Sequence, residues 1–111
     1  MATSFNYVQG DTGPQIRLTL VNEDTTTPTD LTGATATLHF RAAGETAILF
    51  SRAFYINSAT ANTGVAILQW NSTDLDQVAG VYEGEVEVVK STGQRETLFE
   101  TLRFRIREDF A

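Results

Sequence analysis

Short stretches in which apolar and polar residues alternate, separated by clusters of Gly, Pro, Asn, Asp and Thr, run through the whole chain. Alternation with a period of two is typical of a β-strand with one buried and one solvated face. It is clearest in residues 15–21, 34–42, 65–70, 81–89 and 95–107. Nowhere does a 3.6-residue period persist over the length of a helix. The sequence therefore predicts an all-β fold.

Two further strands are predicted at residues 4–9 and 46–56, the second of which is apolar on both faces. Residues 71–80 are too short for a full helix but suit one helical turn, which Ser72 or Thr73 could cap. Short strands with turn residues between them are typical of a two-sheet sandwich. We predict an immunoglobulin-like antiparallel β-sandwich of about seven strands with one short helical turn.

The last two predicted strands allow a prediction of register. If the turn after Lys90 is a three-residue loop with Gly93 in the left-handed conformation, Lys90 lies opposite Gln94. Without a bulge, the same register places Tyr82 opposite Leu102, with both side chains in the core.

This register also assigns side chains to the outer side of the sheet, where Glu85 faces Phe99 and Arg103 lies near Glu83. An apolar centre with mixed charges at its rim is typical of a contact patch, and both signs on neighbouring strands suit contact between copies of one chain. The alternative is a solvated sheet face whose Glu and Arg side chains pair with each other. The candidate interface consists of Phe99, Val81, Glu83, Glu85, Arg103 and Arg105.

Composition removes several classes of function. The 111 residues contain no cysteine, which excludes disulfides and thiolate metal sites. With 14 acidic and 8 basic residues the net charge is −6, which argues against nucleic acid and anionic membranes as partners. The single histidine, His39, argues against a His-based triad or metal site, so we predict no cofactor and no metal.

The size and the ends of the chain give two further expectations. A chain of this length is predicted to form a single domain over residues 1–111. Its start has neither the basic nor the apolar region of a signal peptide, and no apolar run has the length of a membrane span.

The triplet Asp11-Thr12-Gly13 matches the one that aspartic proteases carry around their catalytic carboxylate. A chain of this size would need a symmetric dimer to bring two such carboxylates together. However, Pro14 follows directly, and the second motif and glycine-rich flap of those enzymes are missing. Gly10, Asp11, Gly13 and Pro14 fit ordinary turn chemistry instead, so we predict a turn and no enzyme.

The order of the turn motifs resembles the immunoglobulin-like N-terminal domain of phage baseplate upper proteins and related short phage tail proteins. The matching stretches are residues 8–20, 28–41, 62–70, 72–89 and 91–98. Within them, the residues that match the family pattern are Gly10, Asp11, Thr12, Asp30, Leu31, Thr32, Gly33, Gly64, Trp70, Asp74, Asp76, Gly80, Tyr82, Gly93, Glu96 and Thr97.

The resemblance implies a non-enzymatic structural protein of a bacteriophage particle: a tail or baseplate adaptor or decoration protein in multiple copies. Its expected partners are other phage structural proteins and copies of itself, and its expected location is the virion, after synthesis in the host cytoplasm. The alternatives are a head decoration protein, a carbohydrate-binding sandwich and the dimeric aspartic protease. Tyr82 follows an Asp-containing turn, as in a tyrosine corner, and Trp70 should pack in the same core; both are predicted to be structural.

Overall fold

The computed structural model describes residues 3–13, 15–21, 27–97 and 101–110. It is nearly all-β, with 49% strand and 3% helix, and its sheets pack as a sandwich, which confirms the predicted fold class. The strands are β1 (Thr3–Val8), β2 (Gln15–Thr19), β3 (Thr35–Ala42), β4 (Phe50–Ala53), β5 (Val65–Gln69), β6 (Gly80–Val89), β7 (Arg95–Thr97) and β8 (Leu102–Arg107). The one described helix is the 3-10 turn η1 (Ala61–Thr63).

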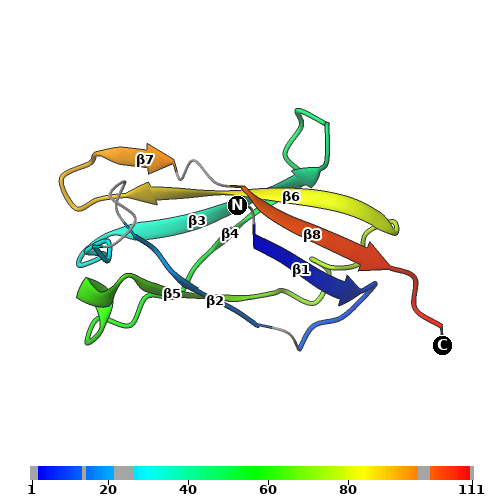
Figure 1. The fold of residues 1–111 in the computed structure, drawn as a ribbon, viewed down its shortest axis with the longest axis horizontal. Helices are drawn as coiled ribbons and strands as arrows, with labels where there is room; N and C mark the ends of the chain where they lie inside the picture. Colours follow the sequence, from blue (N-terminus) through cyan, green and yellow to red (C-terminus); the bar gives the residue numbers. More distant parts are fainter. Residues whose placement is uncertain (1–2, 14, 22–26, 98–100, 111) are drawn as a thin grey trace.

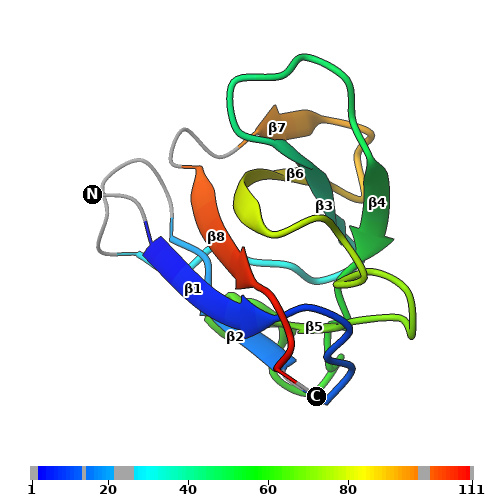
Figure 2. The ribbon, with the colours of Figure 1, turned by 90° about the vertical axis from the view of Figure 1, so that its right-hand side faces the viewer.

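The strands form a six-stranded and a two-stranded sheet (Figures 1 and 2). The larger sheet has the order β1-β8-β6-β3-β4, with β7 also paired to β6, and the smaller one pairs β2 with β5. All pairs are antiparallel except β1 with β8, so the expectation of a purely antiparallel sandwich is wrong at this edge. Parallel neighbours require a long connection, and here almost the whole chain lies between the two strands.

The core lies between the two sheets, where the inward residues of each strand meet. On β3 these are Ala36, Leu38 and Phe40, and each is buried. Gly84 on β6 also faces inward, because a Cβ at this position would lie 2.6 Å from Leu38 Cδ1 and 2.9 Å from Phe104 Cε2. Glycine thus leaves the room that two larger core side chains occupy.

The predicted register holds for β7 and is wrong for β8. The Lys90 N–H donates to the Gln94 carbonyl at 2.8 Å, and Gly93 has φ +89°, as expected for the three-residue loop. Further along, Tyr82 lies opposite Phe104 rather than Leu102. The shift is two residues, so side chains keep their predicted faces.

The helical turn is not where it was predicted. It lies at Ala61–Thr63, directly before β5, and ends at Gly64, whose φ of +77° is left-handed. Asn71 to Asp76 instead form two successive turns, in which the Asp74 N–H donates to the Asn71 carbonyl and the Asp76 N–H to the Thr73 carbonyl. The predicted strand 46–56 is likewise shorter, because the chain leaves β4 and crosses to the small sheet, where Tyr55 pairs with Ile67.

Candidate interaction face on the six-stranded sheet

One side of the six-stranded sheet faces away from the core, and we call it the outer face. It carries a column of acidic side chains on β6 with basic side chains on both flanking sides. Its polar and apolar members on the strands are Ser4, Asn6, Val8, Thr35, Thr37, His39, Arg41, Ser51, Ala53, Val81, Glu83, Glu85, Glu87, Val89, Arg95, Arg103, Arg105 and Arg107.

Two of the three glutamates on β6 have cationic neighbours on the same face. Glu83 lies opposite Arg41 on β3, and its Oε1 is 3.0 Å from both Nε and NH2 of that arginine. Glu87 has its Oε2 3.7 Å from Arg95 Nε and its Oε1 3.8 Å from His39 Nε2. These contacts fix the two ends of the acidic column.

His39 joins a serine to a glutamate, an arrangement the sequence did not predict. Its Nδ1 is 2.7 Å from the Ser51 hydroxyl, directly opposite on β4, while Nε2 faces Glu87. Serine hydrolases use such a row together with donors that stabilise an oxyanion. Here the guanidinium of the neighbouring Arg41 is held by Glu83, and the row lies on an open sheet. We interpret it as a polar row across three strands.

The centre of the outer face carries exposed charges of both signs. Among the described residues, Glu85, Arg103 and Arg105 form no ion pair, and all three side chains are exposed. Val81, which is 39% exposed, lies opposite Arg105. A shallow depression of about 130 Å³ lies beside them, lined by His39, Arg41, Thr46, Ile48, Glu83, Gly84, Glu85 and Thr101. The structure therefore brings five of the six predicted interface residues onto one face; Phe99 lies outside the described residues.

Tyr82 and Trp70, the predicted structural pair, lie in the core. Tyr82 is 6% exposed, and its hydroxyl donates to the Val78 carbonyl four residues earlier, as in a tyrosine corner. Burial raises the pKa of this hydroxyl above its ordinary value. Trp70 packs edge-on against the rings of Phe40 and Phe104, at centroid distances of 6.0 and 5.7 Å.

The segment with the protease-like triplet forms a turn. The Asp11 N–H donates to the Val8 carbonyl at 3.0 Å, and the Val8 N–H donates back to Asp11 Oδ2 at 3.2 Å. Gly10 has φ +83°, which a side chain would strain, and Gly13 follows without close neighbours. The carboxylate thus closes its own turn; Pro14 lies outside the described residues.

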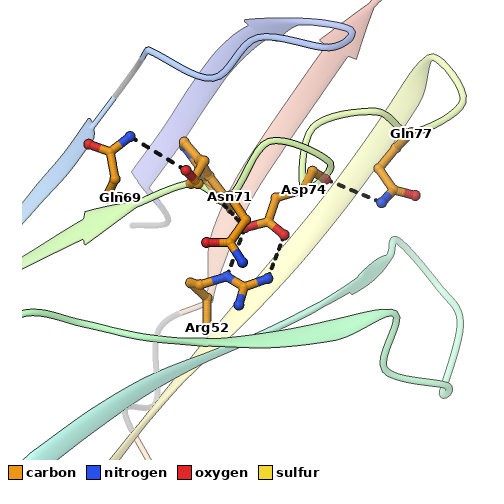
Figure 3. A network of polar contacts seen from close by, with 6 residues as sticks. Arg52, Gln69, Asn71, Asp74 and Gln77 are labelled. Carbon is orange, nitrogen blue, oxygen red and sulfur yellow. Dashed lines mark hydrogen bonds and ion pairs between the residues drawn. The ribbon is translucent and has the colours of Figure 1, made fainter.

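A polar cluster centred on the buried Asp74 lies on the inner side of the sheet, and the sequence did not predict it (Figure 3). Arg52 Nε donates to Asp74 Oδ2 at 2.8 Å, and Arg52 Nη2 donates to Asp74 Oδ1 at 2.6 Å. The Asn71 N–H donates to the same Oδ2 at 2.8 Å, and the Gln77 amide donates to the Asp74 carbonyl at 3.2 Å. The cluster ties the β5–β6 connection to β4. The only indication of this cluster in the sequence is the alternation in β4, which places the charged Arg52 on the same inward side as Phe50.

Within the described part of the chain, no group of three or more His, Cys, Asp or Glu side chains could hold a metal ion. In the same residues, no helix is long and apolar enough to cross a membrane.

No protein-family model and no curated protein sequence matches this chain. Among solved structures, it is similar to CopC from Methylosinus trichosporium OB3b, with a TM-score of 0.52 and 10% identity over 100% of this chain and 89% of that one. A second similar structure is AggA, the major subunit of aggregative adherence fimbriae type I from Escherichia coli. The match has a TM-score of 0.39 and 14% identity, and it covers 96% of this chain and 91% of AggA. At such low identity, the first likeness shows a shared fold.

The comparison corrects the predicted function. CopC, which shares the fold, is not a phage protein, so the prediction of a phage tail or baseplate component, or of a head decoration protein, is wrong. The physical reason lies in the motifs that carried it. Gly10, Gly33, Gly64 and Gly93 all have positive φ and form turns that a sandwich needs whatever its function. The resemblance to the phage domain and the virion location stay predictions.

Proposed function

We propose that this domain is a non-enzymatic interaction module that binds protein through its outer face. The observation that carries the proposal is the set of exposed charges at the centre of that face, Glu85, Arg103 and Arg105, which have no ion-pair partner among the described residues. Val81 lies beside Arg105, and Glu83, which lies beside Arg103, is paired with Arg41. A surface with both signs of charge and a few apolar groups suits a protein partner better than a small molecule.

The depression beside Glu85 supports the same proposal. At about 130 Å³ it is well below the roughly 300 Å³ of a typical ligand site. Ile48, which is 56% exposed, and Val81 add apolar area at its sides. A side chain of a partner protein is the size of group that such a depression accepts.

The test is site-specific photocrosslinking in the organism that makes the chain. A photoreactive residue at position 85 should form protein adducts, because Glu85 lies at the centre of the outer face. The matched control is position 17, where Arg17 is exposed on the two-stranded sheet at the opposite side. Adducts from position 17 alone, or from neither position, would refute the proposal.

A further inference from the structure

We propose that the outer face binds a second copy of this chain across a two-fold axis that runs along the strands between β6 and β8. In this arrangement, Arg103 of each copy contacts the acidic column of the other. The inference rests on the proposed function and names its partner.

The order of charges across the sheet favours this axis. β6 presents Glu83, Glu85 and Glu87, and its neighbour β8 presents Arg103 and Arg105. A two-fold axis between these strands lays β6 of one copy over β8 of the other, so opposite charges meet twice. An axis centred on β6 itself would place glutamate over glutamate, which is unfavourable.

The positions of the charged residues along the two strands also match. Glu83 lies beside Arg103, and Val81 lies beside Arg105. An axis parallel to the strands preserves these levels in the partner copy. Arg103 therefore faces Glu83 of the second copy, with Glu85 one step along, and the stem of Arg105 covers Val81. Since Arg41 already holds Glu83, Glu85 is the available acid for Arg103.

The outer face also differs in charge from the rest of the chain. Its five arginines and three glutamates give the outer face a formal charge of +2, so a net charge of −6 leaves −8 on the remainder. Two molecules with the same negative net charge repel each other in most relative orientations. Contact between the outer faces avoids this repulsion.

The area of the outer face indicates how strongly two copies should bind each other. This axis lays β6 over β8 and β3 over β1, and it leaves β4 without a strand opposite it. Four strands about 4.8 Å apart and roughly 20 Å long give a paired face of about 400 Å². Two such faces together bury roughly 800 Å², at the low end of the range of weak and transient complexes. The dimer should therefore depend on concentration, and added salt should weaken it.

The experiment is a charge exchange followed by sedimentation of the whole chain. Glu85→Arg sets an introduced cation against Arg103 of the other copy, and Arg103→Glu sets an introduced anion against Glu85. Each variant alone should therefore dimerise about tenfold or more weakly. In an equimolar mixture, both contacts of the mixed dimer are attractive, and association should return to the wild-type level. The control Arg17→Glu should dimerise like the wild type.

The outcomes separate the inference from the proposed function. Thermal melts of each variant first show that it is folded. Restored association in the mixture supports the two-fold pairing. If each variant alone dimerises as strongly as the wild type, the two-fold pairing is overturned. A monomeric wild type whose position 85 crosslinks to a different protein overturns the inference and leaves the proposed function in place. No dimer and no adduct overturns both.

Discussion

Two groups of charged side chains lie on opposite sides of the six-stranded sheet and differ in how completely they are paired. On the inner side, Asp74 is 3% exposed, and both its carboxylate oxygens accept hydrogen bonds from Arg52, one of them also from the Asn71 N–H. On the outer face, Glu85 and Arg103 are exposed without an ion pair among the described residues. A buried charge must be fully paired for the chain to fold, whereas an exposed one need not be. The inner group therefore serves the fold, and the outer group is available to a partner.

The largest effect should come from breaking the inner group. Asp74→Asn removes the charge that holds Arg52, and it should lower the free energy of unfolding by about 3 kcal/mol. Urea unfolding measures the loss. The control is Asp76→Asn, because Asp76 is exposed in the same turn and should change stability by less than about 0.5 kcal/mol. Equal losses in both variants would show that the Arg52–Asp74 pair has no special role.

A smaller loss is expected at the tyrosine corner, which anchors the same connection. Tyr82→Phe leaves the Val78 carbonyl without its donor and should cost about 1–2 kcal/mol. Tyr55→Phe is the matched control, since Tyr55 is 62% exposed. A melt of Tyr82→Phe that coincides with the wild type would mean that the hydroxyl contributes nothing to the corner.

Neutralising the outer group should leave the fold almost unchanged. Glu85→Gln and Arg103→Gln should each shift the free energy of unfolding by less than about 0.5 kcal/mol, because neither side chain has an ion pair to lose among the described residues. Unfolding is measured in dilute solution, where copies do not meet. A loss as large as that of Asp74→Asn would remove the contrast between the two groups.

The smallest effect concerns an exposed carboxylate that does have local partners. The Thr32 hydroxyl and, next in strength, its N–H donate to Asp30 Oδ1 at 2.6 and 3.0 Å, and they hold the pKa of Asp30 below its ordinary value. A carboxylate whose pKa is lower in the folded than in the unfolded state stabilises the folded state at pH values above its unfolded-state pKa. This stabilisation is lost as the pH falls through the folded-state pKa. Thr32→Val removes the hydroxyl donor, so an NMR titration should show the Asp30 pKa rising toward its ordinary value. An unchanged pKa would show that this contact does not act in solution.

The sequence predicted local features better than contacts between distant segments. The alternation of apolar and polar residues predicted strands and the side of the sheet on which their side chains lie. The turn at Gly93 predicted the hairpin register correctly as far as Thr97. The two-residue shift before β8, the parallel pairing of β1 with β8 and the Arg52–Asp74 pair all join segments that no local pattern relates. The functional prediction failed because it depended on turn residues, which specify a fold and not a partner.

The central claim is that copies of this chain meet through the outer face, and backbone NMR spectra over a range of concentrations test it most directly. The account predicts that the amide resonances of Glu85, Thr101 and Arg103 move as concentration rises, while those of Arg17 and Thr19 on the two-stranded sheet stay fixed. Resonances that move only on the two-stranded sheet, or nowhere at any concentration, would contradict it.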